Sequence, residues 1–86
     1  MPKLTLKQNL EKLRSQLSAT HELDAETREQ LAEVADTIER ILHEPGADHR
    51  EAFDRIEDAA LSFEARHPSF ARILSEVTDA IAKLGI

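Results

Sequence analysis

Histidine and carboxylate side chains are the groups in this 86-residue chain that could bind a metal or transfer a proton, because it contains four histidines and no cysteine. His43 and His49 flank a Pro-Gly turn, whereas a metalloprotease helix needs two histidines one turn apart. Glu64 and His67 form one Glu-x-x-His pair, whereas a di-iron bundle needs two such pairs and further glutamates. We therefore expect turn and capping roles for these side chains, and no bound metal.

One further cluster could form at an end of the molecule. In an up-and-down helical bundle the first and third loops meet, which would bring His21 and His67 together with Glu22 and Asp24 nearby. Such a group could titrate near neutral pH or bind a metal. Solvent-exposed loop side chains are the simpler interpretation. The cluster supports an alternative function, a small-ligand or metal-responsive regulatory protein with a His/carboxylate site at one end of the bundle.

Covalent catalysis has no recognisable residue set in this sequence. A serine nucleophile elbow needs a strand, a sharp turn and a helix, and the sequence predicts no strands. A phosphate-binding loop needs several glycines in a short stretch, and the whole chain contains two glycines. We therefore expect a non-enzymatic protein without catalytic residues, without cofactor-binding residues and without a cofactor.

The elements that would position any site are four amphipathic helices. Apolar residues recur every three or four positions in four segments, which places one apolar stripe on each helix. The pattern predicts one all-α domain over residues 1–86, with four antiparallel helices in an up-and-down bundle or in hairpins paired between subunits. The stripes consist of Leu6, Leu10, Leu13 and Leu17; Leu31, Val34, Ile38 and Ile41; Phe53, Ile56, Ala60 and Phe63; and Phe70, Ile73, Val77, Ala80 and Leu84.

Capping signals predict the limits of the first two helices. Thr5 with Gln8 forms a capping box, so the first helix should begin there and end near Ser18. Asp24 is a good N-cap, with a glutamate two residues later in the first turn. The second helix should end near His43, because the Pro-Gly pair that follows cannot continue it.

The last two helices are predicted in the same way. Asp48 and Glu51 form a capping box, from which the third helix should run to about Arg66. Pro68 fits the first turn of a new helix, which should run to Leu84 before a C-terminal glycine. A kink at this proline within one long helix is the competing prediction.

Charge is distributed unevenly around a net value of −6. The first 20 residues hold four basic side chains and one acidic one, whereas residues 21–44 hold eight acids and two arginines. We expect these two helices to be neighbours joined by ion pairs. The basic segment has no aromatic side chain for base stacking, so we expect no nucleic-acid binding.

The distribution of apolar residues predicts where the protein is located and which partners it binds. No apolar run approaches the roughly 18 residues of a membrane span, and the N-terminus lacks a signal peptide, so we expect a cytoplasmic protein without membrane contact. The fourth helix carries two overlapping apolar strips, so it is either the most central helix of the bundle or the helix that also contacts a second subunit. A core this small often needs oligomerisation. We predict a homodimer or another protein partner, and a self-association or protein-interaction module. Its candidate interaction surface is Phe70, Leu74, Val77 and Ile81.

Two short elements resemble a known family. The run Phe63-Glu64-Ala65-Arg66-His67-Pro68, the ending Asp79-Ala80-Ile81-Ala82-Lys83-Leu84-Gly85-Ile86 and the opening Leu10-Glu11-Lys12-Leu13 are similar to short bacterial proteins catalogued only as a domain of unknown function. The chain departs from that pattern at Arg66, where an acid is usual, and at Leu84, where methionine is usual. The resemblance implies a small helical bacterial protein and carries no reaction or catalytic residue.

Overall fold

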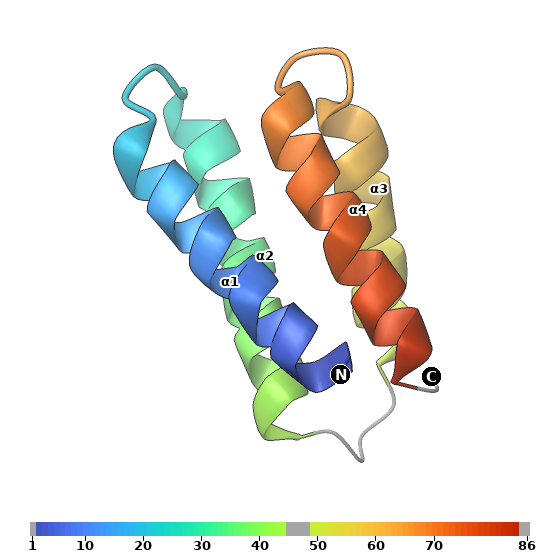
Figure 1. Cartoon of the computed structure of the whole chain (residues 1–86). Coiled ribbons are helices and arrows are strands. Elements are labelled where there is room, and N and C mark those ends of the chain that lie inside the picture. The colour runs from blue at the N-terminus through green and yellow to red at the C-terminus, as the bar shows by residue number, and fades with distance from the viewer. Residues whose placement is uncertain (1, 45–48, 85–86) are drawn as a thin grey trace.

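The computed structural model describes residues 2–44 and 49–84, which form four helices joined by short connections (Figure 1). Helices make up 85% of the described residues and no strand occurs among them, so the predicted all-α class is confirmed. None of the described helices combines the length and the apolar character that crossing a membrane requires. The helices are α1 (Pro2–Ala19), α2 (Ala25–His43), α3 (Arg50–Phe63) and α4 (Pro68–Lys83).

The helices form an up-and-down bundle in which three pairs pack closely. α1 packs against α2 and against α4, and α3 packs against α4, whereas α2 and α3 approach each other much less closely. Figure 1 shows two antiparallel hairpins side by side, with the α1–α2 and α3–α4 connections at the same end. The two hairpins therefore close on each other within a single chain, through α1 and α4.

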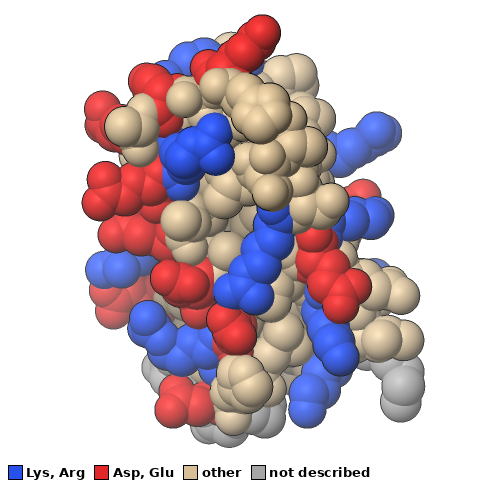
Figure 2. All heavy atoms as spheres, turned by 90° about the vertical axis from the view of Figure 1, so that its left-hand side faces the viewer, with Lys and Arg blue, Asp and Glu red and all other residues tan. Residues whose placement is uncertain are grey.

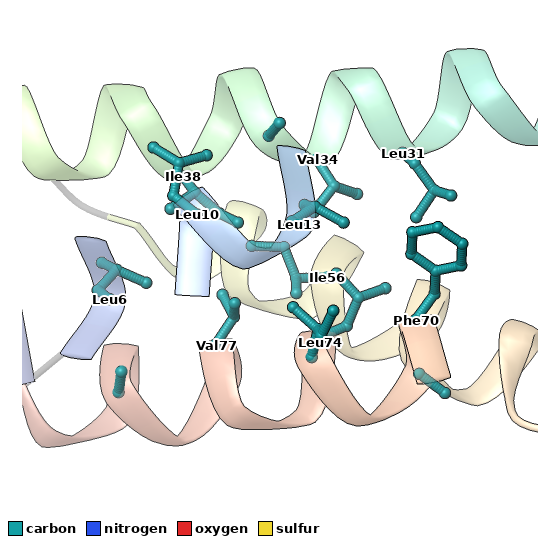
Figure 3. Close-up of a cluster of buried hydrophobic side chains, with 14 of the residues drawn as sticks. Leu6, Leu10, Leu13, Leu31, Val34, Ile38, Ile56, Phe70, Leu74 and Val77 are labelled. Carbon is teal, nitrogen blue, oxygen red and sulfur yellow. The ribbon is translucent and has the colours of Figure 1, made fainter. Parts of the chain in front are cut away.

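The apolar stripes meet in one continuous core (Figure 3). Leu10 and Leu13 of α1 lie between α2 and α4 in this view, facing Ile38 on one side and Val77 on the other. Full burial of a leucine, isoleucine or valine side chain contributes roughly 1.5–3 kcal/mol. The stripes are therefore the main source of stability. The largest fully buried side chains are Leu6, Leu13, Leu31, Ile38, Ile41, Ile56, Phe63, Phe70, Leu74, Val77 and Ile81.

The limits of α1 and α2 test the capping signals. α1 begins at Pro2, so the prediction that Thr5 caps it is wrong: proline fits a first helical turn, and Thr5 lies within the helix. The N-cap predicted at Asp24 is confirmed, because its carboxylate accepts a hydrogen bond of 2.9 Å from the Thr27 backbone N–H. α2 ends at His43, as predicted.

The limits of α3 and α4 differ slightly from the prediction. α3 begins at Arg50, and the predicted cap Asp48 lies outside the described residues. α3 ends at Phe63, earlier than the predicted Arg66, because residues 64–66 form a turn. Pro68 begins a separate helix, so a kink within one long helix is wrong. The predicted glycine cap after α4 lies outside the described residues.

Candidate functional site

The wide apolar face of α4 lies inside the chain. α4 is the helix that packs against both α1 and α3, so its two overlapping strips are covered from two sides. The predicted interaction surface is therefore part of the core of the single chain, and none of its residues is more than 2% exposed. These residues are Phe70, Leu74, Val77 and Ile81.

The open wall of the bundle is a groove between α2 and α3, with a volume of about 800 Å³. Its apolar floor belongs to the core: Ile41, Ile56 and Phe63 are each 1% exposed. Ala52 and Ala59, which stand two helical turns apart on α3, line the groove and are half-buried. Because alanine side chains are short, Ala52 and Ala59 leave open space on the side of α3 that faces α2.

Charged side chains form the rim of this groove. On α3, Arg55 donates to the Glu51 carboxylate at 3.0 Å, one turn away. On α2, Asp36 lies 3.8 Å from the Arg14 guanidinium of α1. Glu33 and Arg40 also line the groove and are exposed, and no ion pair joins either of them to another residue within 2–44 or 49–84.

One end of the groove is closed by His49. Its ring is 7% exposed, and its Nε2 atom lies 2.7 Å from the backbone oxygen of Glu44, just beyond the last turn of α2. The sequence predicted capping or a solvated loop position for this histidine. His49 is the N-cap residue of α3, although its side chain makes no capping hydrogen bond to that helix. Its ring is not solvated but forms a buried tie between the end of α2 and the start of α3, whereas His43 is exposed at the surface.

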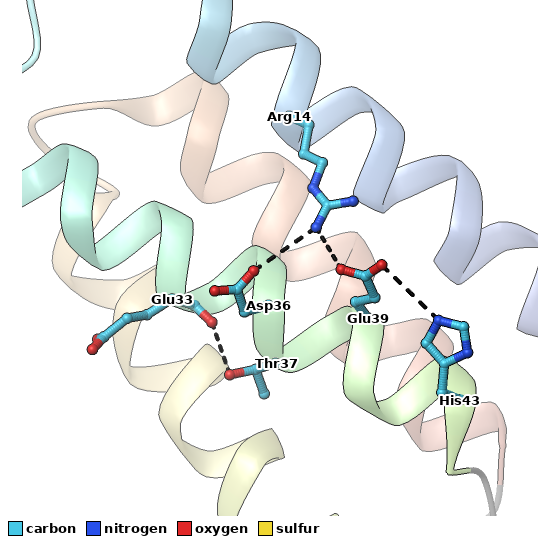
Figure 4. A network of polar contacts seen from close by, with 6 residues as sticks. All are labelled: Arg14, Glu33, Asp36, Thr37, Glu39 and His43. Atoms are coloured by element: carbon cyan, nitrogen blue, oxygen red, sulfur yellow. Dashed lines mark hydrogen bonds and ion pairs between the residues drawn. The ribbon is translucent and has the colours of Figure 1, made fainter.

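The contact between α1 and α2 confirms the predicted charge pairing. Arg14 donates to the Glu39 carboxylate at 2.7 Å, and both Glu39 and Asp36 surround its guanidinium (Figure 4). Figure 2 shows acidic side chains gathered along one margin of this face, with Lys and Arg side chains beside them. The hydrogen bond from Arg14 and its positive charge hold the pKa of the Glu39 carboxyl below its ordinary value.

The loop end of the bundle contains the other predicted cluster. The His67 ring makes edge-on contacts with Phe63 and Phe70, at centroid distances of 6.0 Å and 6.3 Å. The Arg66 guanidinium lies 5.7 Å from the centre of the Phe63 ring. The Phe-Glu-x-x-His-Pro element therefore builds the corner between α3 and α4, with Pro68 in the first turn of α4.

The first and third connections lie at the same end of the bundle (Figure 1). Hydrogen bonds from the hydroxyl and the backbone N–H of Thr27 lower the pKa of Asp24, and the nearby charges of Arg66 and His67 lower it further. His21 is exposed. Among residues 2–44 and 49–84, no group of three or more histidine or carboxylate side chains is placed to hold a metal ion. Packing against two phenylalanines is thus the observed role of His67.

The groove between α2 and α3 is the feature that sequence reasoning missed. The periodicity of each helix predicted four buried stripes, and it carried no direct signal for which neighbouring pair would pack least closely. A signal was present on α3, because its stripe has the fewest large apolar side chains among the four and because Ala52 and Ala59 stand beside that stripe. The position of His49 had no such signal, since its burial depends on how the two hairpins meet.

Comparison with known proteins identifies the family without adding a function. Searches of curated proteins and of solved structures found no match. The model of one family, described as a domain of unknown function, DUF4404, matches residues 6–86. This match covers nearly the whole chain and agrees with the resemblance seen in the corner element and the C-terminal run. The chain therefore belongs to the DUF4404 family.

Proposed function

We propose that this chain is a non-enzymatic self-association or protein-interaction module whose binding surface is the groove between α2 and α3. The observation that carries the proposal is the open wall of the bundle, where α2 and α3 pack less closely than the other neighbouring helices. The groove runs along two helices, with the half-buried Ala52 and Ala59 on one wall and charged side chains along its rim. Those are the properties of sites that accept an amphipathic helix.

The small size of the chain supports the same proposal. Below about 70–80 residues a single core rarely supplies more than about 3–5 kcal/mol, and oligomerisation is one of the usual additions. At 86 residues this chain is close to that range. The groove would let a partner helix complete the fourth side of the bundle. The face of α4 offers no equivalent, because α1 and α3 already pack against it from two sides. The proposal also includes the bacterial origin that the family resemblance implies and the cytoplasmic location that the sequence predicts.

A substitution that fills the groove tests this function. Ala59→Trp places a large ring in the half-buried wall, so it should displace an occupant while leaving the core in place. Ala32→Trp is the matched control, because Ala32 is exposed on α2 and does not line the groove. Circular dichroism would check that both variants are folded.

The measurement is sedimentation equilibrium of the pure proteins, together with a pull-down of tagged protein from cell extract. We expect the wild type and Ala32→Trp to self-associate or to retain a partner, and Ala59→Trp to lose that association. A protein that stays monomeric and retains no partner would contradict the proposal. So would an association that Ala59→Trp leaves unchanged.

A further inference from the structure

We infer that the occupant of the groove is α2 of a second copy of this chain, packed antiparallel about a two-fold axis at Thr37. The inference rests on the proposed function and adds the identity, the direction and the register of the partner helix. It is carried by the order of side chains along the groove-facing stripe of α2. The α2 residues that line the groove are Gln30, Glu33, Val34, Asp36, Thr37, Arg40, Ile41 and Glu44.

Apart from Asp36, which lies 3.8 Å from the Arg14 guanidinium of α1, the groove-lining residues of α2 are spaced symmetrically about Thr37. Thr37 has stripe members three and four positions before it and three and four positions after it, and one more at seven positions on each side. An antiparallel copy centred on Thr37 therefore places each half of the stripe against the other half. Symmetric pairing of this kind is isologous: when one residue contacts a second residue across the axis, the reverse contact also forms.

A two-fold axis at Thr37 sets position 33 opposite position 41 and position 34 opposite position 40, so Glu33 of one copy and Arg40 of the other stand one residue apart along the paired helices. Glu33 of one copy would lie beside Arg40 of the other, and the axis would generate this ion pair twice. The amide of Gln30 would face the carboxylate of Glu44 in the same reciprocal way. A parallel copy would instead set Glu33 against Glu33 and Arg40 against Arg40, which like-charge repulsion disfavours. Charge thus selects the antiparallel direction.

The Glu33 and Arg40 side chains are available for ion pairs with a second copy. Glu33 and Arg40 are exposed, and neither is joined in an ion pair within the part of the chain that the structure describes. In Figure 4 the Glu33 carboxylate points away from the other drawn side chains, including Arg14. Forming the dimer would therefore not break an ion pair of either side chain.

The residue on the axis is suited to close approach of two helices. Thr37 has a short side chain, and its hydroxyl already donates to the Glu33 backbone oxygen at 2.9 Å (Figure 4). Covering it would leave no unsatisfied donor, which removes the main cost of burying a hydroxyl. Ala52 and Ala59, on the facing wall of the groove, give the second copy of α2 room beside α3.

Two single charge reversals test the register. Glu33→Arg would set arginine against arginine at both symmetry-related pairs, and Arg40→Glu would set glutamate against glutamate there. We expect each variant alone to weaken self-association at least about tenfold, with the loss reduced at high salt. Glu29→Arg is the matched control, since it makes the same charge change on α2 at an exposed position outside the groove.

The decisive sample is an equimolar mixture of the two weakened variants. In a heterodimer the arginine introduced at position 33 would meet the glutamate introduced at position 40. The unchanged Arg40 of the first variant would meet the unchanged Glu33 of the second, so both ion pairs would join opposite charges. We expect the mixture to reach twice the chain mass in sedimentation equilibrium, and the double variant Glu33→Arg/Arg40→Glu to do so alone. All variants should keep the helical circular dichroism of the wild type, because both positions are exposed.

The outcomes separate this inference from the proposed function. If the wild type self-associates but Glu33→Arg and Arg40→Glu behave like the control Glu29→Arg, the proposed pairing of α2 with α2 is wrong. The proposed function as an interaction module would still stand. Weakened single variants that neither associate in the mixture nor recover in the double variant would overturn the two-fold arrangement. A wild type that is monomeric at all concentrations would overturn the second copy as occupant, and the Ala59→Trp pull-down would then decide the proposed function separately.

Discussion

The Nε2 atom of His49 lies 2.7 Å from the backbone oxygen of Glu44, which ties the start of α3 to the end of α2. This contact spans the connection between the two hairpins and closes one end of the groove. Farther along, short alanine side chains face the space between the helices. The wall between α2 and α3 is thus fastened at one end and open along its middle.

Removing this tie should destabilise the chain. We expect His49→Ala to lower the free energy of unfolding by about 1–3 kcal/mol, because it empties a buried position and leaves the Glu44 oxygen without this partner. His43→Ala is the control at an exposed position, and it should change stability by less than about 0.5 kcal/mol. Urea denaturation followed by circular dichroism measures both. Equal effects would show that His49 carries no special packing role.

The internal position of α4 gives a second prediction. Leu74 is 0% exposed, so Leu74→Ala should cost about 2–5 kcal/mol through lost burial and a residual cavity. Leu61 is 64% exposed, and Leu61→Ala should stay within about 0.5 kcal/mol of the wild type. The comparison is made by denaturant titration at a fixed protein concentration. A small effect at Leu74 would mean that this face of α4 is not packed in the way described.

At Asn9 we predict a substitution that stabilises the chain. Its side chain is 3% exposed, and its Nδ2 atom is buried without a hydrogen-bond partner in the described structure. We expect Asn9→Leu, which keeps the number and branching of side-chain heavy atoms, to raise the free energy of unfolding by about 1 kcal/mol, because an unsatisfied donor is removed. Asn9→Asp should lower it, because a charge would be buried. Thermal melts of the three proteins would test the order, and a destabilised leucine variant would contradict it.

The Arg14–Glu39 pair predicts a dependence on pH. The pKa of Glu39 is lowered in the folded chain, so the pair contributes stability above the ordinary glutamate pKa, and this contribution is lost as the pH falls through the lowered value. Arg14→Gln should return the pKa of Glu39 toward its ordinary value and weaken this acid dependence. Carbon-13 NMR titration of the Glu39 carboxyl measures the change. An unaltered pKa in the variant would show that Arg14 is not its cause.

Local patterns predicted the helices well where they act within one segment. The stripe of α2, the N-cap at Asp24 and the proline that opens α4 all depend on neighbours along the chain, and all are found. The prediction that Thr5 caps α1 was wrong because two helix-start signals stand close together in this segment. The helix begins at the proline three residues before Thr5. The turn at residues 64–66 ends α3 early, so that His67 can pack between two phenylalanines.

The candidate site could not be predicted in the same way, because it depends on how whole helices share space. The width of the apolar face of α4 was read correctly, and two partners do cover it, but both lie in the same chain. A stripe shows which side of a helix is buried and does not show whether the neighbour belongs to a second copy. The groove arises from the difference between alanines on α3 and larger side chains elsewhere, which becomes visible only when the helices are placed together.

Cysteine crosslinking at the proposed two-fold axis is the most direct test of self-association through the groove. The chain has no cysteine, so Thr37→Cys introduces a single thiol, and the axis would place the two copies of this residue against each other at disulfide range. We predict that mild oxidation converts this variant to a covalent dimer, and that Ala32→Cys, exposed on α2 outside the groove, remains largely monomeric. A Thr37→Cys protein that crosslinks no faster than Ala32→Cys would contradict the account.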